Sequence, residues 1–125
     1  MLFEVDSSKS LEEIGQGLVD AAARHKFGVL TVHDLQETMR KKGVEFDRAV
    51  RIYEVCNPQQ AKKVLEANPA VSTALPCRIS VYETGEGMRL ATILPSEMMK
   101  MFGGGMEETA REVEDVVKAM MREAA

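Results

Sequence analysis

The sequence lacks the features that mark secreted, membrane-spanning or nucleic-acid-binding proteins. It has no tryptophan and only two cysteines in 125 residues, too few for the disulfide framework that stabilises small secreted domains. No apolar run approaches the roughly 18 residues that span a bilayer, and residues 1–6 lack the basic and apolar regions of a signal peptide. The 16 basic and 20 acidic residues leave a formal charge of -4, which opposes a nucleic-acid-binding surface.

The remaining composition is that of an ordinary globular domain. A length of 125 residues is close to the commonest single-domain size, and such a chain buries about two-thirds of its unfolded surface. Hydrophobic residues make up 45% and charged residues 29%, which excludes disordered and fibrous classes. We therefore expect one domain over residues 1–125, in the reducing cytoplasm and without membrane association.

Alternating or β-branched segments predict the strands. They lie at 2–5, 27–32, 51–56, 78–84 and 88–94. The segments 78–84 and 88–94, joined through Gly85-Glu86-Gly87, form the clearest hairpin. The segment 27–32 is apolar on both faces, so we expect it in the centre of the sheet.

Capping residues and helical periodicity predict the helices. Helices are expected after Ser10, Asp34 and Asn57, near 96–99, and over 107–123. Ser10 with Glu13 fits a capping box. Gly15 and Gly17 lie inside the first helix, where each costs about 1 kcal/mol relative to alanine. Close packing against the sheet or a second subunit explains their presence.

The mixed order of these elements predicts an α+β domain. We expect a two-layer sandwich in which helices cover one face of a mixed or antiparallel sheet of about four to five strands. The other face is then exposed to solvent, covered by a ligand, or paired with a partner.

Cys56 and Cys77 are candidates for thiol chemistry. A helical segment separates their strands, and such a crossover normally joins parallel strands. Parallel strands would place the thiols at opposite ends of the sheet, beyond the roughly 7 Å that a disulfide allows between Cα atoms. Separate structural cysteines are therefore favoured, and one reactive or ligand-facing thiol remains open. No donor spacing typical of a metal site is present, and no cofactor can be assigned.

Two further patterns have both plain and functional interpretations. Glu54 and Glu83 alternate with Tyr53 and Tyr82 along their strands. If the two strands are neighbours, these residues could line one patch of the open sheet face. A solvated polar face is the plainer interpretation. Nine methionines, six of them after residue 97, indicate either core packing or an adaptable contact surface.

Three segments together resemble the family named domain of unknown function 302, small bacterial and archaeal proteins. They are 52–58 (IYEVCNP), 75–78 (LPCR) and 81–83 (VYE). The resemblance extends over nearly the whole chain. It implies a two-layer α+β domain with a TATA-binding-protein type of topology that forms a homodimer, and it implies no catalytic residues. The fold analogy is no argument for DNA binding.

Within the matching blocks, Asn57 and Pro58 have a structural reason as helix cap and first-turn proline. Cys77 and Arg78 have no such structural reason. Arg78 could bind a carboxylate or phosphate, lower the pKa of the Cys77 thiol, or form a surface salt bridge.

The sequence thus predicts a homodimer that binds a small ligand, an anion among the candidates, rather than an enzyme. The candidate ligand-binding residues are Cys56, Cys77, Arg78, Glu54 and Glu83. The alternatives are a thiol-dependent or sulfur-handling enzyme centred on Cys77, and a structural or regulatory module that binds another protein through the methionine-rich end.

Overall fold

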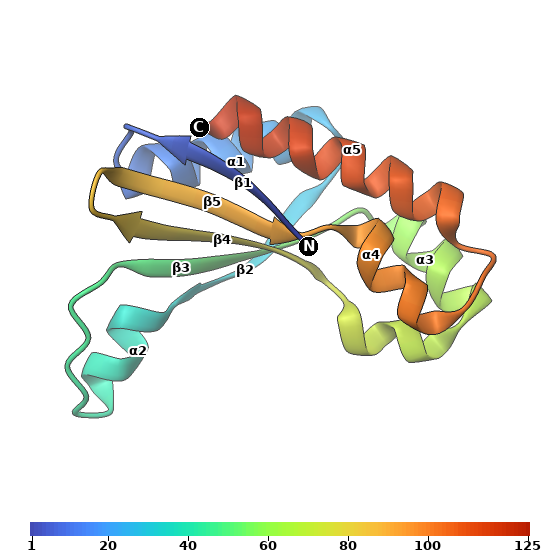
Figure 1. Cartoon of the computed structure of the whole chain (residues 1–125), viewed down its shortest axis with the longest axis horizontal. Coiled ribbons are helices and arrows are strands. Elements are labelled where there is room, and N and C mark those ends of the chain that lie inside the picture. Colours follow the sequence, from blue (N-terminus) through green and yellow to red (C-terminus); the bar gives the residue numbers. More distant parts are fainter.

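A five-stranded sheet forms one layer of the protein. The computed structural model describes all residues 1–125, and the sheet has the strand order β1-β5-β4-β3-β2 with every neighbouring pair antiparallel (Figure 1). The strands are β1 (Leu2–Ser7), β2 (Gly28–Asp34), β3 (Val50–Cys56), β4 (Cys77–Thr84) and β5 (Gly87–Ile93). The predicted α+β class and the hairpin of β4 and β5 are confirmed.

Helices form the second layer. They are α1 (Leu11–Arg24), α2 (Leu35–Lys41), α3 (Pro58–Ala67), α4 (Pro95–Met99) and α5 (Glu107–Ala124), with short 3₁₀ turns η1 (Pro69–Ala74) and η2 (Lys100–Phe102). Helices α1 and α5 pack against each other over one face of the sheet, while α3 and α4 lie at one end (Figure 1). None of the helices has the length and apolar character needed to cross a bilayer.

Local capping explains where the helices begin. Ser10 and Glu13 form both bonds of the expected capping box at α1. Asp34 accepts a hydrogen bond from the Glu37 amide at α2. The Asn57 side chain accepts from two amides in the first turn of α3. These bonds satisfy amides that have no partner within the helix.

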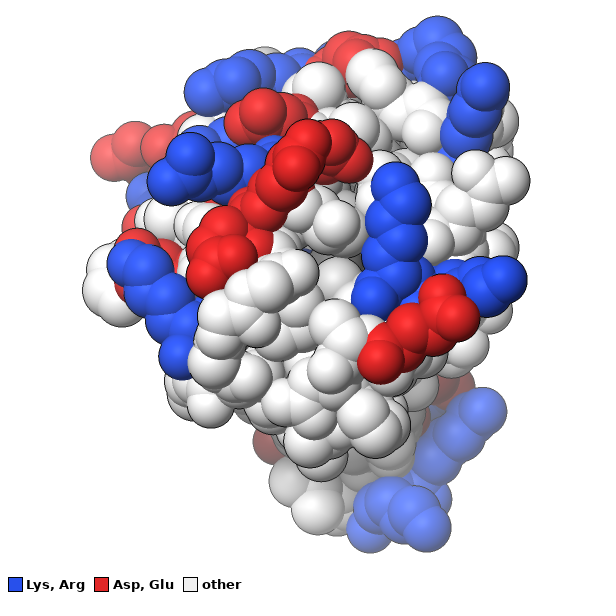
Figure 2. Space-filling view, turned by 90° about the vertical axis from the view of Figure 1, so that its right-hand side faces the viewer, with Lys and Arg blue, Asp and Glu red and all other residues white.

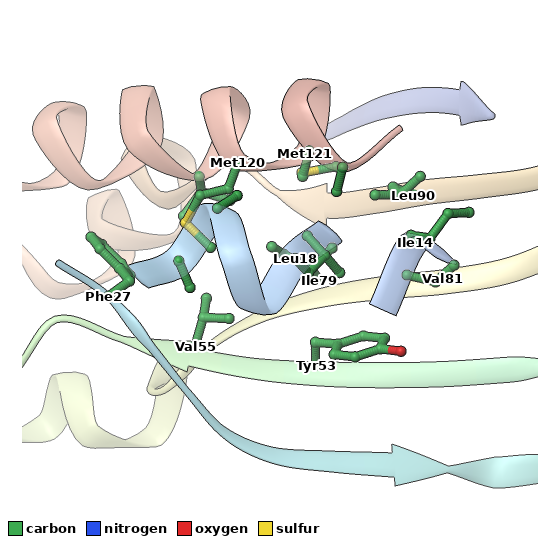
Figure 3. Close-up of a cluster of buried hydrophobic side chains, with 14 of the residues drawn as sticks. Ile14, Leu18, Phe27, Tyr53, Val55, Ile79, Val81, Leu90, Met120 and Met121 are labelled. Carbon is green, nitrogen blue, oxygen red and sulfur yellow. The ribbon is translucent and has the colours of Figure 1, made fainter. Parts of the chain in front are cut away.

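The main core lies between the two layers. Figure 3 shows that its side chains come from α1, α5 and the strands and interdigitate between them. Its largest fully buried members include Ile14, Leu18, Ile79, Leu90, Met120 and Met121. Met99 and Met106 are buried in a second cluster beside α3 and α5. Most of the late methionines are therefore core residues, and only Met101 is strongly exposed, at 72%.

Strand β2 lies at an edge of the sheet, so its predicted central position is wrong. Only the start of β2 packs on the core, through Val29, and a register shift follows between Val29 and Thr31. Beyond it, Leu30 and Val32 are 60% and 44% exposed. We call residues 30–49 the arm; it contains α2, projects from the body (Figure 1), and includes no buried residue. Apolar residues on both faces of β2 thus reflect an uncovered edge rather than a buried strand.

Candidate functional site

Cys56 and Cys77 lie at the same end of the sheet, contrary to the expectation from their crossover. Strands β3 and β4 are antiparallel neighbours, and Val55 pairs directly with Cys77. The crossover contains α3 followed by η1, so the chain runs out and back and enters β4 beside the end of β3. The assumption of parallel strands was therefore wrong. Both thiols are free.

The two cysteines line one small cavity, which we call the thiol cavity. Its volume is about 40 Å³, and it is lined by 15 residues, ten of them hydrophobic. The sheet contributes Val55 and Cys77, and the wall opposite is built from α3, α4 and α5. No aspartate, glutamate, lysine, arginine or histidine is among the lining residues. The cavity is therefore an uncharged, partly open space between the two layers.

Helix α4 closes part of this cavity with Pro95 and Met99. Its own N-cap residue supplies no side-chain hydrogen bond. Instead, Glu114 of α5 accepts from the Ser96 amide at 3.1 Å and from the Ser96 hydroxyl at 2.6 Å. Burial alone would raise the pKa of Glu114, but the bonds from Ser96 and the nearby Lys118 lower it below its usual value. The carboxylate therefore stays charged at neutral pH and fixes α4 to α5.

The end of the molecule formed by α3, α4 and the start of α5 is visible in Figure 2. A broad uncharged area lies there between groups of lysine, arginine, aspartate and glutamate side chains. Met101 in η2 is the most exposed large apolar side chain of the protein. The outer surface at this end of the molecule thus has a broad uncharged area.

Both thiols are protonated at physiological pH. Burial raises the pKa of Cys77 to about 11, and the neighbouring Cys56 contributes a further increase. Burial also raises the pKa of Cys56, which is the less enclosed of the two. Because the thiolate is the nucleophile, the environment of Cys77 suppresses rather than activates its reactivity.

We expect iodoacetamide at pH 8 to modify Cys56 at least about tenfold faster than Cys77. With a pKa of about 11, Cys77 has only about one thiolate per thousand molecules at that pH. Mass spectrometry of peptides from the native protein gives both rates, and the denatured protein serves as control because its two thiols should react alike. Faster modification of Cys77 would contradict this description.

Arg78 does not line the thiol cavity. It lies across from Glu54 on the open face of the sheet, with Arg78 Nε 3.6 Å from Glu54 Oε2. His33 Nε2 is 3.5 Å from the other oxygen of Glu54. Arg78 and Cys77 do line a separate, larger hollow of about 180 Å³ next to η1. An anion bound there by Arg78 would have to approach the carboxylate of Glu54, which already balances the arginine charge.

Glu83 belongs to another part of the protein. It follows Arg78 by an odd number of residues along β4, so the two side chains lie on opposite faces of the sheet. Its Oε1 accepts from the Ala49 amide at 3.1 Å, at the base of the arm. Tyr53 is buried at 3% exposure on the core face. The expected single patch of Glu54, Glu83, Tyr53 and Tyr82 is therefore not formed.

Gln60 is the site residue that the sequence did not reveal. It lines the thiol cavity, and its Nε2 donates to Glu112 Oε2 of α5 at 3.0 Å. Its Oε1 is buried and has no hydrogen-bond partner. A glutamine in the first turn of a helix usually faces solvent, so no local signal distinguishes it.

The structure contains no cluster of three or more histidine, cysteine, aspartate or glutamate residues suited to a metal ion.

Comparison with known proteins places this fold in a family. The model described as "Domain of unknown function DUF302" matches residues 3–124. The chain belongs to the DUF302 family. The crystal structure of the uncharacterized conserved protein DUF302 from Bacillus stearothermophilus is similar, with a TM-score of 0.94 and 29% sequence identity over 99% of this chain and 98% of that chain. No protein of curated function matches. The DUF302 fold therefore accounts for essentially the full length described here.

Proposed function

We propose that this DUF302 protein is a small-ligand-binding module whose ligand occupies the thiol cavity. The observation that supports this best is the lining of the cavity by residues of both layers, with Cys56 and Cys77 beside each other in it. Mostly apolar cavities with a few polar groups are the usual form of small-molecule sites. A volume of about 40 Å³ limits this ligand to a few non-hydrogen atoms. The ligand of this proposal lies next to the two thiols, whereas Arg78, Glu54 and Glu83 lie outside the cavity.

Native mass spectrometry of the protein purified without added ligand tests the proposal. The native mass is compared with the mass of the denatured protein. We expect an additional mass that is lost on denaturation. Ala61 lines the cavity and Ala70 does not, so Ala61→Leu should abolish the additional mass and Ala70→Leu should retain it. A protein without additional mass, whose amide spectrum also responds to no member of a small-molecule panel, would contradict the proposal.

A thiol-dependent enzyme is the weaker alternative. The elevated pKa of Cys77, about 11, opposes a nucleophilic role. A module that binds another protein through the methionine-rich end also has less support, because four of those methionines are buried. Binding rather than catalysis is therefore the activity that this site favours.

We extend the proposal to a homodimer in the cytoplasm, where two free thiols remain reduced. The arm supports this part, since a seven-residue helix such as α2 is marginal by itself and gains stability when its apolar surface is covered. Leu30, Val32, Val44 and Phe46 of the arm are all exposed. The arm has no net charge, so two copies of it would not repel each other. Its acidic residues are Asp34, Glu37, Glu45 and Asp47, and its basic residues are Arg40, Lys41, Lys42 and Arg48.

We expect Leu30→Lys to weaken the dimer at least about tenfold, since it places a charge on an apolar contact surface. Leu2→Lys is the matched control, because Leu2 is 57% and Leu30 60% exposed and the two lie on opposite edge strands. Sedimentation equilibrium measures both dissociation constants. A monomeric wild type would exclude the dimer, and equal effects of the two substitutions would exclude the arm as its interface.

A further inference from the structure

We propose that strand β2 pairs antiparallel with β2 of a second copy of this chain, about a two-fold axis at Thr31, so that two five-stranded sheets join into one. This inference rests on the proposed function, because it assumes the homodimer formed through the arm. It adds the strand that makes the contact, its direction and its register.

Strand β2 has an open outer side. It is the last strand of the sheet and pairs only with β3, so the backbone groups that point away from β3 have no strand beside them. Proteins protect such edges with lysine or proline, because an open edge is a template for another strand. Strand β2 contains neither residue. The register shift lies at its start, and regular pairs with β3 run from Thr31 to Asp34.

The opposite edge of the sheet is protected by charge. Strand β1 carries Glu4 and Asp6, both exposed, and the single Arg89 pairs with both carboxylates. Two antiparallel β1 strands centred on Val5 would place Glu4 of each copy opposite Asp6 of the other, and like charges in opposite positions destabilise a strand pair. Strand β2 has no charged residue before His33. The second copy therefore pairs with β2 rather than with β1.

The register follows from the exposed apolar side chains of β2. With Thr31 on the two-fold axis, Leu30 of each copy lies opposite Val32 of the other. Leu30 and Val32 are 60% and 44% exposed and lie on the same face of the strand, so the four side chains form one apolar cluster. A pair centred on Leu30 would place Val32 opposite Gly28, and one centred on Val32 would place Leu30 opposite Asp34.

The ends of the paired strands are compatible in charge. In this register His33 lies opposite Val29, and Asp34 lies opposite Gly28, two residues from the exposed Lys26 of the second copy. No like charges are opposed, and an acidic group comes near a basic one at each end. Helix α2 begins directly after Asp34, so the pairing brings this short helix beside the second copy. The arm thus gains the neighbour that it lacks in one chain.

Cross-linking of Thr31→Cys with a short bis-maleimide tests this inference, because residue 31 of one copy would face residue 31 of the other. Glu4→Cys is the matched control, since it is also an exposed position within an edge strand. The wild type gives the background from Cys56 and Cys77. We expect Thr31→Cys to cross-link at least about tenfold faster than Glu4→Cys, because dimerisation raises the effective concentration of the two thiols. A denaturing gel measures both rates.

Hydrogen exchange of the wild type makes the test independent of any variant. Amides of β2 should exchange more slowly at protein concentrations above the dissociation constant of the dimer than below it, and those of β1 should exchange equally at both. A dimer whose β2 amides exchange equally at both concentrations, or whose Thr31→Cys and Glu4→Cys variants cross-link at equal rates, would overturn this inference alone. A wild type that is monomeric in sedimentation equilibrium would overturn the proposed homodimer together with it.

Discussion

Gly15→Ala should destabilise the protein by about 1–3 kcal/mol, the usual effect of overpacking a core. A Cβ atom at Gly15 would lie 2.4 Å from the hydroxyl oxygen of Tyr53. Tyr53 is 3% exposed and packs among the core residues, so its ring cannot turn outward to make room. Elsewhere in an α-helix the same substitution would stabilise by about 1 kcal/mol. The close approach of α1 to β3 reverses the sign.

Urea denaturation of both proteins measures this difference. Gly28→Ala is the matched control, since a Cβ atom at Gly28 meets no atom within 4 Å, and we expect its stability to stay within about 0.5 kcal/mol of the wild type. If Gly15→Ala were as stable as Gly28→Ala, the packing of α1 against Tyr53 would be looser than described.

Glu114→Ala should accelerate chemical modification of Cys77 by at least about tenfold, the effect of losing one hydrogen bond to a charged group. Hydrogen bonds to a charged group contribute about 1.5–3 kcal/mol each, and every 1.4 kcal/mol corresponds to a factor of ten. Glu114 makes two such bonds to Ser96, and these attach α4 to α5 over the thiol cavity. Loss of both should increase the fraction of molecules in which α4 has moved away.

The segment that moves is residues 95–102, which comprises α4 and η2. It is followed by Gly103 and Gly105, whose φ angles of 86° and 93° disfavour other residues. A Cβ atom at either glycine would meet nothing within 4 Å, so this connection is not packed against the body. Its second attachment is a hydrogen bond from Asn68 Nδ2 to the Phe102 carbonyl at 3.2 Å. A hydrogen bond from a single side chain thus holds the segment at each end, in addition to the packing of Met99 in the second core cluster.

Alkylation rates in a Cys56→Ser background report only on Cys77. Glu97→Ala is the control, because Glu97 also lies on α4 but pairs only with the exposed Lys100. Thermal unfolding verifies that each variant is folded at the labelling temperature. If Glu114→Ala and Glu97→Ala gave the same rate, the Ser96–Glu114 bonds would have no part in closing the cavity.

The sequence by itself determined the local structure of this protein. Helix caps at Ser10, Asp34 and Asn57 and the hairpin around residues 85–87 follow from interactions between residues a few positions apart. The motif blocks around Cys56 and Cys77 also sufficed to place the chain in its family. Such features depend on residues close together in the sequence, so they can be predicted before any tertiary contact is known.

Only the tertiary structure decided which distant residues meet. Strand β2 has the composition of a central strand, yet it lies at the edge, because sheet order depends on which faces the whole chain can bury. Cys56 and Cys77 share a cavity because α3 and η1 return the chain to the end of β3 from which it left. The unpartnered oxygen of Gln60 arises from a contact with Glu112, 52 residues away. Contacts of this kind result from packing between layers, which no local pattern encodes.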